Sequence, residues 1–366
     1  MKPNKDKMVF VAMSGGVDSA VAASLLKREG HEVVGFFMHL NAPAEHTATT
    51  ERRCCSMDDA RDAQRCAEVL GIDFYTLPYR DRFAGIIRRF VEDYRAGRTP
   101  YPCVQCNQDL KFGALLELAE GIGAGAVATG HYARLSQDGD RPRLWRAADP
   151  DKDQSYVLFG LTRSQLSRAL FPVGGYPKAG IRALAREARL PVQDKPDSQD
   201  ICFIPRGSVG EFLRRQAPET ARPGPIVDGE GKALGAHPGI AFFTVGQRKG
   251  LGALGGTRYV LRLEPETNTV VVGGREELFR QTLVSERVNW LMPDPEGPFQ
   301  ARVQIRYSHK AAPAVVTPLA GGRARVEFEI PQAAITPGQV AVFYDPEAGE
   351  EVLGGGWITQ DPPGNP

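Results

Sequence analysis

The sequence has no long apolar run and no marked excess of charge of either sign. Across its 366 residues there is no stretch of about 18 consecutive apolar residues, so we expect no membrane-spanning helix and no membrane partner. The first apolar stretch reaches glycine too early for a secretory signal peptide, and we therefore expect a cytoplasmic protein. The formal net charge of +1 neither indicates nor excludes nucleic-acid binding, because phosphate affinity depends on a local basic surface.

Cysteine is also scarce, with six positions in the whole chain. In a long chain without a secretion signal, such cysteines favour free thiols, metal ligands or redox groups over a disulfide framework. Cys103 and Cys106 form a C-x2-C pair in the proline-flanked stretch TPYPCVQCN, which leads into an expected helix. Zinc is a weaker interpretation, because no second cysteine pair or H-x3-5-H motif lies nearby. For Cys54, Cys55 and Cys66, packing is the better interpretation.

The loop near the amino terminus lacks both common nucleotide-binding motifs. Neither GxxxxGK[ST] nor GxGxxG is present, which argues against simple phosphoryl transfer and hydride transfer. The chain has instead SGGVDS, from Ser14 to Ser19, between the apolar run MVFVAM and the helical pattern AVAASLLKREG. Small residues let backbone amides approach an anion, and the helix N-terminus adds its dipole. The loop predicts a phosphate or pyrophosphate site, and a tight capped turn is the structural alternative.

Strand and helix patterns alternate through the first half of the chain. A second buried strand, HEVVGFFMHL, follows the loop and its helix, which completes a βαβ unit. Further helices are expected at about 58–70, 82–96, 108–120, 163–171 and 178–189, with strands at IDFYTLP and AGAVATG and a polar hairpin or loop between 134 and 155. The pattern predicts a doubly wound parallel sheet.

The composition and the hydrophobic pattern of the sequence change after Cys202. Glycine, proline and short β-rich runs such as ARVQIRYS and GQVAVFYD indicate antiparallel structure, with a β-barrel from about residue 280. We expect a catalytic domain at 1–205, a small central module at 206–280 that binds tRNA, and a C-terminal β-barrel domain at 281–366.

Several separate strings resemble those of the bacterial tRNA-specific 2-thiouridylase family over nearly the whole chain. The hexapeptide SGGVDS itself resembles the PP-loop of ATP pyrophosphatases, which have the adenine nucleotide α-hydrolase-like fold. The other strings are CCSMDDARDA, KFG, ATGHYAR, KDQSYVL, DSQDICFIP, LGAHPGIAFFTVGQRKGLG and IRYSHKA. The resemblance implies ATP-dependent 2-thiolation of the wobble uridine in tRNAs for Lys, Glu and Gln. ATP and Mg²⁺ would be cofactors, and the sulfur donor would be a sulfur-carrier protein, a cysteine desulfurase or sulfide.

The resemblance also implies roles for particular residues. Positions matching the nucleotide contacts are Ala12, Met13, Ser14, Gly15, Gly16, Val17, Asp18, Ser19, Met38 and Gly130, with Asp18 also helping to hold magnesium. Positions matching the tRNA contacts are Lys152, Asp153, Gln154, Arg306 and Tyr307. The structural alternatives are core packing for Met38 and Gly130, a solvated turn for 152–154, and an exposed strand for 306–307.

The cysteines leave two routes for sulfur open. In the family, Cys202 would carry a persulfide and Cys106 would release the product by forming a disulfide. The commoner form of the family has an aspartate where this chain has Cys103. Cys103, Cys106 and Cys202 are therefore expected to ligate a [4Fe-4S] cluster with one open iron, and the persulfide route is the alternative.

A different enzyme class shares the phosphate loop. An ATP-dependent amide or amidine synthetase would also activate an oxygen by adenylation, for attack by ammonia. Such an enzyme needs no cysteine pair with a distant third cysteine, and a glutaminase domain or amino-acid pocket would be expected. We keep it as the alternative function.

Overall fold

The computed structural model describes residues 8–40, 57–197, 201–204 and 209–360. They form two compact units, each considered by itself. The first unit contains the described residues of 1–86, 103–206 and 350–352, and the second contains those of 87–102, 207–349 and 353–366. No helix among the described residues is long and apolar enough to cross a membrane.

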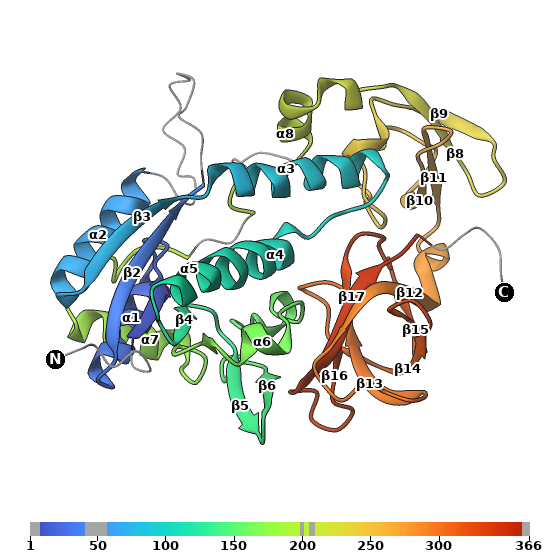
Figure 1. Cartoon of the computed structure of the whole chain (residues 1–366). Coiled ribbons are helices and arrows are strands. Elements are labelled where there is room, and N and C mark those ends of the chain that lie inside the picture. Colours follow the sequence, from blue (N-terminus) through green and yellow to red (C-terminus); the bar gives the residue numbers. More distant parts are fainter. Residues whose placement is uncertain (1–7, 41–56, 198–200, 205–208, 361–366) are drawn as a thin grey trace. The chain divides into compact units, whose positions relative to one another are not determined.

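The first unit is built on a five-stranded parallel sheet with helices packed against it (Figure 1). The strand order is β3-β2-β1-β4-β7, and every neighbouring pair is parallel. The strands are β1 (Met8–Ala12), β2 (Glu32–His39), β3 (Asp73–Pro78), β4 (Ala126–Thr129) and β7 (Ala169–Leu170). The predicted parallel α/β fold is confirmed.

The helix after β1 is the most deeply buried of the first unit. In α1 (Val17–Arg28), nine residues between Val17 and Leu26 are buried, because the sheet and the neighbouring helices α2 (Met57–Leu70) and α7 (Lys178–Glu187) surround it. Helices α2 and α7 agree with the expected ranges to within two residues, whereas α1 begins three residues before the expected pattern AVAASLLKREG. The helix expected at 82–96 is α3 (Arg80–Arg95), whose residues are divided between the two units.

The cysteine pair lies in an unusual helix. Helix α4 (Pro102–Gln105) continues into a π-helix (Cys106–Ala114) and then into α5 (Leu115–Gly121). The sequence predicted a helix from about residue 108, so its start was placed too late and its π-helical form was not predicted. π-Helices are rare and are frequent at functional sites.

One predicted helix is partly wrong. The range 163–171 contains only a short helix, α6 (Arg163–Leu166), followed by strand β7. A capping box between Thr162 and Gln165 starts α6. Residues 169–170 are held in an extended conformation because they pair with β4. The polar segment at 134–155 includes the hairpin of β5 (Arg134–Asp138) and β6 (Arg141–Trp145), as expected.

The second unit contains a four-stranded sheet and a closed six-stranded barrel. The sheet has the order β10-β11-β8-β9, and the barrel has the order β12-β15-β14-β13-β16-β17, which confirms the predicted β-barrel. Helix α8 is Val209–Gln216; the strands are β8 (Gly224–Val227), β9 (Ala233–His237), β10 (Tyr259–Glu264), β11 (Thr269–Gly273), β12 (Phe279–Trp290), β13 (Phe299–Gln304), β14 (Ala312–Leu319), β15 (Arg323–Ala333), β16 (Val340–Tyr344) and β17 (Val352–Ile358). Short 3-10 helices occur at Ser155–Val157 in the first unit and at Pro218–Thr220, Ile240–Phe242 and Glu276–Leu278 in the second.

Candidate active site

The phosphate loop lies where the order of the parallel strands reverses. From β1 the chain passes to β2 on one side, and β4 pairs with β1 on the other. Ligands of open α/β sheets bind at the carboxyl ends of the strands at such a switch point. Gly130, directly after β4, packs against the start of α1, since a Cβ there would lie 2.5 Å from the Ser19 nitrogen. The loop after β1 and the end of β4 therefore form one site.

Hydrogen bonds within the loop hold its backbone open to an anion. The Ser19 hydroxyl accepts from the Ser14 N–H at 3.1 Å and donates to the Gly16 carbonyl at 3.2 Å. Gly15 has a φ of +73°, and a Cβ there would lie 2.2 Å from the Asp59 carbonyl oxygen, so only glycine fits. Gly16 caps α1 without a side-chain hydrogen bond. This geometry suits phosphate binding at the helix N-terminus.

Met13 and Met38 support the phosphate loop with buried side chains, unlike the glycines of the loop itself. Both side chains are buried, and the Met13 sulfur fills the space beside Gly35, where a Cβ would meet it at 2.6 Å. The Met13 N–H donates to the Phe36 carbonyl at 2.8 Å. Met13 is thus bonded and packed against β2, and Met38 is a residue of β2, so both methionines support the loop from the sheet.

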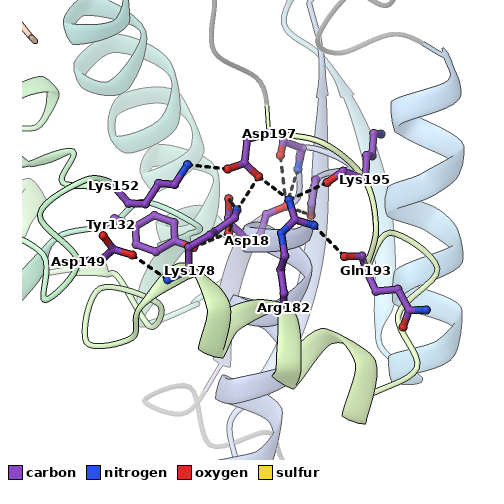
Figure 2. Close-up of polar contacts among 12 residues, drawn as sticks. Asp18, Tyr132, Asp149, Lys152, Lys178, Arg182, Gln193, Lys195 and Asp197 are labelled. Carbon is purple, nitrogen blue, oxygen red and sulfur yellow. Dashed lines mark hydrogen bonds and ion pairs between the residues drawn. The ribbon is translucent and has the colours of Figure 1, made fainter.

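Asp18 is the centre of a charged network around the start of α1 (Figure 2). Lys178 donates to both carboxylate oxygens of Asp18, at 2.7 and 2.9 Å, and the Tyr132 hydroxyl donates to Oδ1 at 2.7 Å. The same lysine pairs with Asp197 at 2.8 Å. Sequence reasoning missed Lys178, because none of the motifs that it used includes α7.

Asp197 gathers three cationic side chains. Besides Lys178, it accepts from Lys152 at 2.8 Å and from Arg182 at 3.0 Å. Burial by itself would raise the pKa of Asp197, but the hydrogen bonds from Lys152 and Lys178 outweigh it and hold the pKa below its ordinary value. The carboxylate is therefore ionised at neutral pH and can hold these cations in place.

Asp18 fits its predicted role as a magnesium ligand. Its two oxygens already lie against an ammonium group, so the position tolerates a cation. Carboxylate oxygen is a donor that Mg²⁺ prefers, usually together with oxygens of the substrate's phosphates. Lys178 would have to give up at least part of this contact to a metal ion.

The π-helix carries a lysine that contacts a buried histidine. The Lys111 ammonium lies 3.4 Å from Nε2 of His131, and Nδ1 of His131 lies 2.7 Å from the Thr129 hydroxyl. An ammonium can only donate, so Nε2 accepts and the ring proton is on Nδ1. Burial, and then the charge of Lys111, hold the pKa of His131 well below its ordinary value. His131 is therefore neutral.

The three predicted cluster ligands do not form a metal site. Cys103, Cys106 and Cys202 all lie in the first unit and are half-buried. Among the residues that the structure describes, no three His, Cys, Asp or Glu side chains are grouped to hold a metal ion. Burial raises the pKa of Cys106, although Lys111 opposes this, and a cluster ligand must be a thiolate. The arrangement does not fit the expected [4Fe-4S] cluster, and we derive no step through one.

The other cysteines divide between the core and the part of the chain left undescribed. Cys66 is fully buried in α2, as expected for a packed cysteine, and burial raises its pKa to about 11. Cys54 and Cys55 lie outside the described residues.

The residues expected to contact tRNA have defined partners. Asp153 accepts from the Ser155 hydroxyl at 2.9 Å and the Ala147 N–H at 3.0 Å, and Gln154 accepts from the Tyr132 N–H at 2.9 Å. Together with the Lys152 contact to Asp197, these bonds place 152–154 beside the Asp18 network.

In the second unit, Arg306 and Tyr307 follow barrel strand β13. Arg306 donates to the Ala333 carbonyl at 3.1 Å, and Tyr307 is 47% exposed.

We predict that His131 makes stability depend on pH. The pKa of His131 is lower in the folded state than in the unfolded chain, so the unfolded chain takes up a proton at a higher pH. The neutral, buried His131 therefore costs no stability above about pH 6.5, and the free energy of unfolding decreases as the pH falls below that value. Urea unfolding at pH 7.5 and 5.5 should show a smaller loss of stability for His131→Gln than for the wild type, by up to about 1.4 kcal/mol per pH unit. Equal losses in the two proteins would contradict the prediction.

Models of three domain families match successive parts of the chain. They are described as the tRNA methyl transferase HUP domain, at residues 7–206, the tRNA methyl transferase PRC-barrel domain, at 210–274, and the aminomethyltransferase beta-barrel domain, at 280–358.

Two relatives that are similar to the chain over nearly its whole length carry the same name. The "tRNA-specific 2-thiouridylase MnmA" of Geotalea uraniireducens is 48% identical over 364 residues, which cover 98% of this chain and 96% of the relative. A protein of the same name from Clostridium perfringens is 46% identical over 355 residues, which cover 96% and 98%. A solved 4-thiouridine synthetase–RNA complex with bound ATP is 20% identical, covers 58% of this chain and 51% of that one, and has a TM-score of 0.36, too low to support an argument.

Proposed function

The chain belongs to the tRNA-specific 2-thiouridylase MnmA family, and from this membership we propose that it catalyses ATP-dependent 2-thiolation of the wobble uridine in tRNA. It is a tRNA sulfurtransferase. The observation that carries the proposal is the SGGVDS loop at the switch point of the sheet, because a uracil oxygen must be activated before sulfur can replace it. We further propose tRNAs for Lys, Glu and Gln as substrates and the cytoplasm as location.

The loop and Asp18 would serve the activation step. Backbone amides of the loop bind the phosphates of ATP, and the uridine 2-oxygen attacks the α-phosphorus while pyrophosphate leaves. Asp18 would hold magnesium, which would supply charge neutralisation for the departing pyrophosphate. Lys178, Tyr132 and Asp197 keep the Asp18 carboxylate in place between turnovers.

The sulfur step would use Cys202 and Cys106. The terminal sulfur of a Cys202 persulfide attacks C2 of the base, and AMP leaves with the 2-oxygen. The Cys106 thiolate then attacks the Cys202 sulfur, which breaks the S–S bond, releases 2-thiouridine and leaves a disulfide between the two cysteines. With a persulfide-bearing sulfur-carrier protein or cysteine desulfurase as donor, an external thiol reductant first reduces the disulfide, and the outer sulfur of the donor persulfide then passes to the Cys202 thiolate while the donor keeps a thiol. With sulfide as donor, sulfide attacks the Cys202 sulfur of the disulfide, which breaks the S–S bond, releases the Cys106 thiolate and forms the Cys202 persulfide directly.

We propose the persulfide route rather than an iron–sulfur route. Its support is that the described residues bring no three metal-ligating side chains together. Iron and sulfide analysis of anaerobically purified protein tests this choice. Full thiolation by protein free of iron supports the persulfide route, and activity that rises in proportion to bound iron contradicts it.

We propose three domains, at 1–205, 206–280 and 281–366. The three family models support these boundaries, because their matches end and begin within about six residues of them. The central module would contact tRNA.

ATP consumption measured with and without tRNA tests the proposed function. A 2-thiouridylase should release pyrophosphate only when tRNA is present, since the base is the adenylated group. Consumption that depends on ammonia or an amino acid, and not on tRNA, would favour an amide or amidine synthetase.

We predict that Arg306→Ala weakens tRNA binding by about 10-fold, the effect of losing one charge-assisted contact to RNA. ATP affinity should be unchanged, because Arg306 belongs to the second unit and the phosphate loop to the first. Filter binding at physiological salt measures the effect, with the exposed barrel residue Arg323 changed to Ala as the control. Unchanged tRNA affinity of the Arg306 variant would contradict a tRNA contact in the segment that follows β13.

A further inference from the structure

Lys195 contacts the phosphate loop from a distant part of the chain. Its ammonium donates to the Gly15 carbonyl at 2.8 Å and to the carboxylates of Asp59 and Asp62, each at 2.7 Å. The side chain is 26% exposed. No step of the proposed reaction uses it, although it touches the loop backbone directly.

Arg182 holds the segment that carries Lys195. The guanidinium donates to the carbonyls of Gln193 and Lys195, at 2.9 and 3.2 Å, and to the Asp197 carboxylate at 3.0 Å. The Lys195 N–H donates to the Val192 carbonyl at 2.9 Å. The lysine therefore reaches the loop from a main chain that is fixed on both sides of it.

The contact fixes one peptide plane of the loop. The described chain has no cis peptide bond, so the Gly15 carbonyl and the Gly16 N–H point in opposite directions within one plane. Lys195 binds the carbonyl, so the Gly16 N–H points away from Lys195. A Cβ at Gly15 would lie 2.2 Å from the Asp59 carbonyl oxygen, so this position must be glycine and depends on Lys195 for a fixed peptide plane. Gly16 is the cap of α1, so its N–H is one of the groups available to an anion there.

Lys195 orients the Gly15–Gly16 peptide plane; it does not attract the phosphates by its charge. It lies between two carboxylates, so the three side chains together carry one negative charge and would not attract a phosphate. Burial works against its charged form, but the hydrogen bonds to Asp59 and Asp62 outweigh this and raise its pKa. The ammonium therefore persists at neutral pH and keeps donating to the Gly15 carbonyl.

We infer that Lys195 is a positioning residue for the polyphosphate of ATP: it holds the Gly15–Gly16 peptide so that the Gly16 N–H faces the phosphates. This inference rests on the proposed ATP site and adds to it a residue far outside the SGGVDS motif. The hexapeptide alone leaves a glycine peptide free to rotate, and Lys195 removes that freedom before the nucleotide binds.

Competition binding tests the inference. A fluorescent ATP analogue, with magnesium, is displaced from the full chain by ATP, pyrophosphate or adenosine. In Lys195→Met the affinities for ATP and pyrophosphate should fall by about 10-fold or more, the effect of losing a hydrogen bond to a charged group. The affinity for adenosine should stay unchanged, which a general loosening of the fold would not produce.

Two further variants serve as controls. Lys195→Arg keeps a cationic donor and should restore most of the pyrophosphate affinity. Lys27→Met removes a lysine that joins α1 to the end of α2 through the Leu70 and Gly71 carbonyls, and it should bind all three ligands like the wild type. Unchanged pyrophosphate affinity in Lys195→Met, or an equal loss for all three ligands, overturns the inference. If wild-type protein binds neither ATP nor pyrophosphate, the ATP site itself is wrong and the inference falls with it.

Discussion

Replacing Asp18 by alanine is expected to reduce tRNA-dependent pyrophosphate release by at least about 100-fold. The change removes the proposed magnesium ligand at the start of α1, and with it the acceptor of two hydrogen bonds from Lys178 and one from the Tyr132 hydroxyl. Without this carboxylate, Lys178 would keep only Asp197 as an acidic partner in the network, and the phosphates would lose the proposed metal ligand. Pyrophosphate release in the presence of substrate tRNA and Mg²⁺ measures the effect.

A matched pair of variants separates catalysis from folding. Asp18→Asn keeps the size of the side chain and should also be inactive, because it removes the charge that binds magnesium. Asp138→Ala removes an aspartate of the exposed hairpin, paired with Arg141, and should retain full activity. Wild-type pyrophosphate release by Asp18→Ala would contradict the assignment of the phosphate loop.

Cys202→Ser and Cys106→Ser are expected to lose tRNA thiolation completely while still releasing pyrophosphate. Serine cannot carry a persulfide or form the disulfide that releases the product. Adenylation should persist, because it depends on the phosphate loop and not on either sulfur. The 2-thiouridine content of the tRNA and the pyrophosphate released, both measured in one reaction, distinguish the two steps. Loss of both pyrophosphate release and thiolation in either variant would contradict the proposal that adenylation does not depend on the cysteines.

Cys103 decides between the two sulfur routes. Under the persulfide route, Cys103→Ser should keep appreciable thiolation, and Cys103→Asp should be tolerated because it restores the residue of the commoner family form. Cys66→Ala is the control, because Cys66 is a buried cysteine of α2 with no proposed role in sulfur transfer. If Cys103→Ser and Cys103→Asp instead lose bound iron and thiolation together, the cluster route is correct.

The sequence predicted the parts of the fold that depend on local patterns. The run MVFVAM, the glycine loop and the following helix appear as β1, a tight loop and α1, because a buried strand and an amphipathic or buried helix have different periodicities. The alternating runs of the C-terminal region form a closed barrel for the same reason. Residues 169–170 were wrongly predicted as helix, since only their pairing with β4 makes them a strand.

Long-range contacts explain what the sequence could not predict at the site. The motif identified Asp18 and Gly15, but their partners Lys178 and Lys195 lie at least 160 residues further along the chain. No period or spacing connects such pairs; only the fold brings them together. The C-x2-C pair similarly suggested metal ligation, although the spacing alone says nothing about the position of the third cysteine.

Nucleoside analysis of the product tests the central claim most directly. Unmodified substrate tRNA is incubated with the full chain, Mg·ATP, a persulfide donor and a thiol reductant, then digested and analysed by mass spectrometry. We predict 2-thiouridine at the wobble position, formed only when ATP is present, with one pyrophosphate released for each sulfur incorporated. A methylated nucleoside, as the descriptions of the matching domain models would suggest, or ATP consumption without any sulfur in the tRNA, would contradict the account.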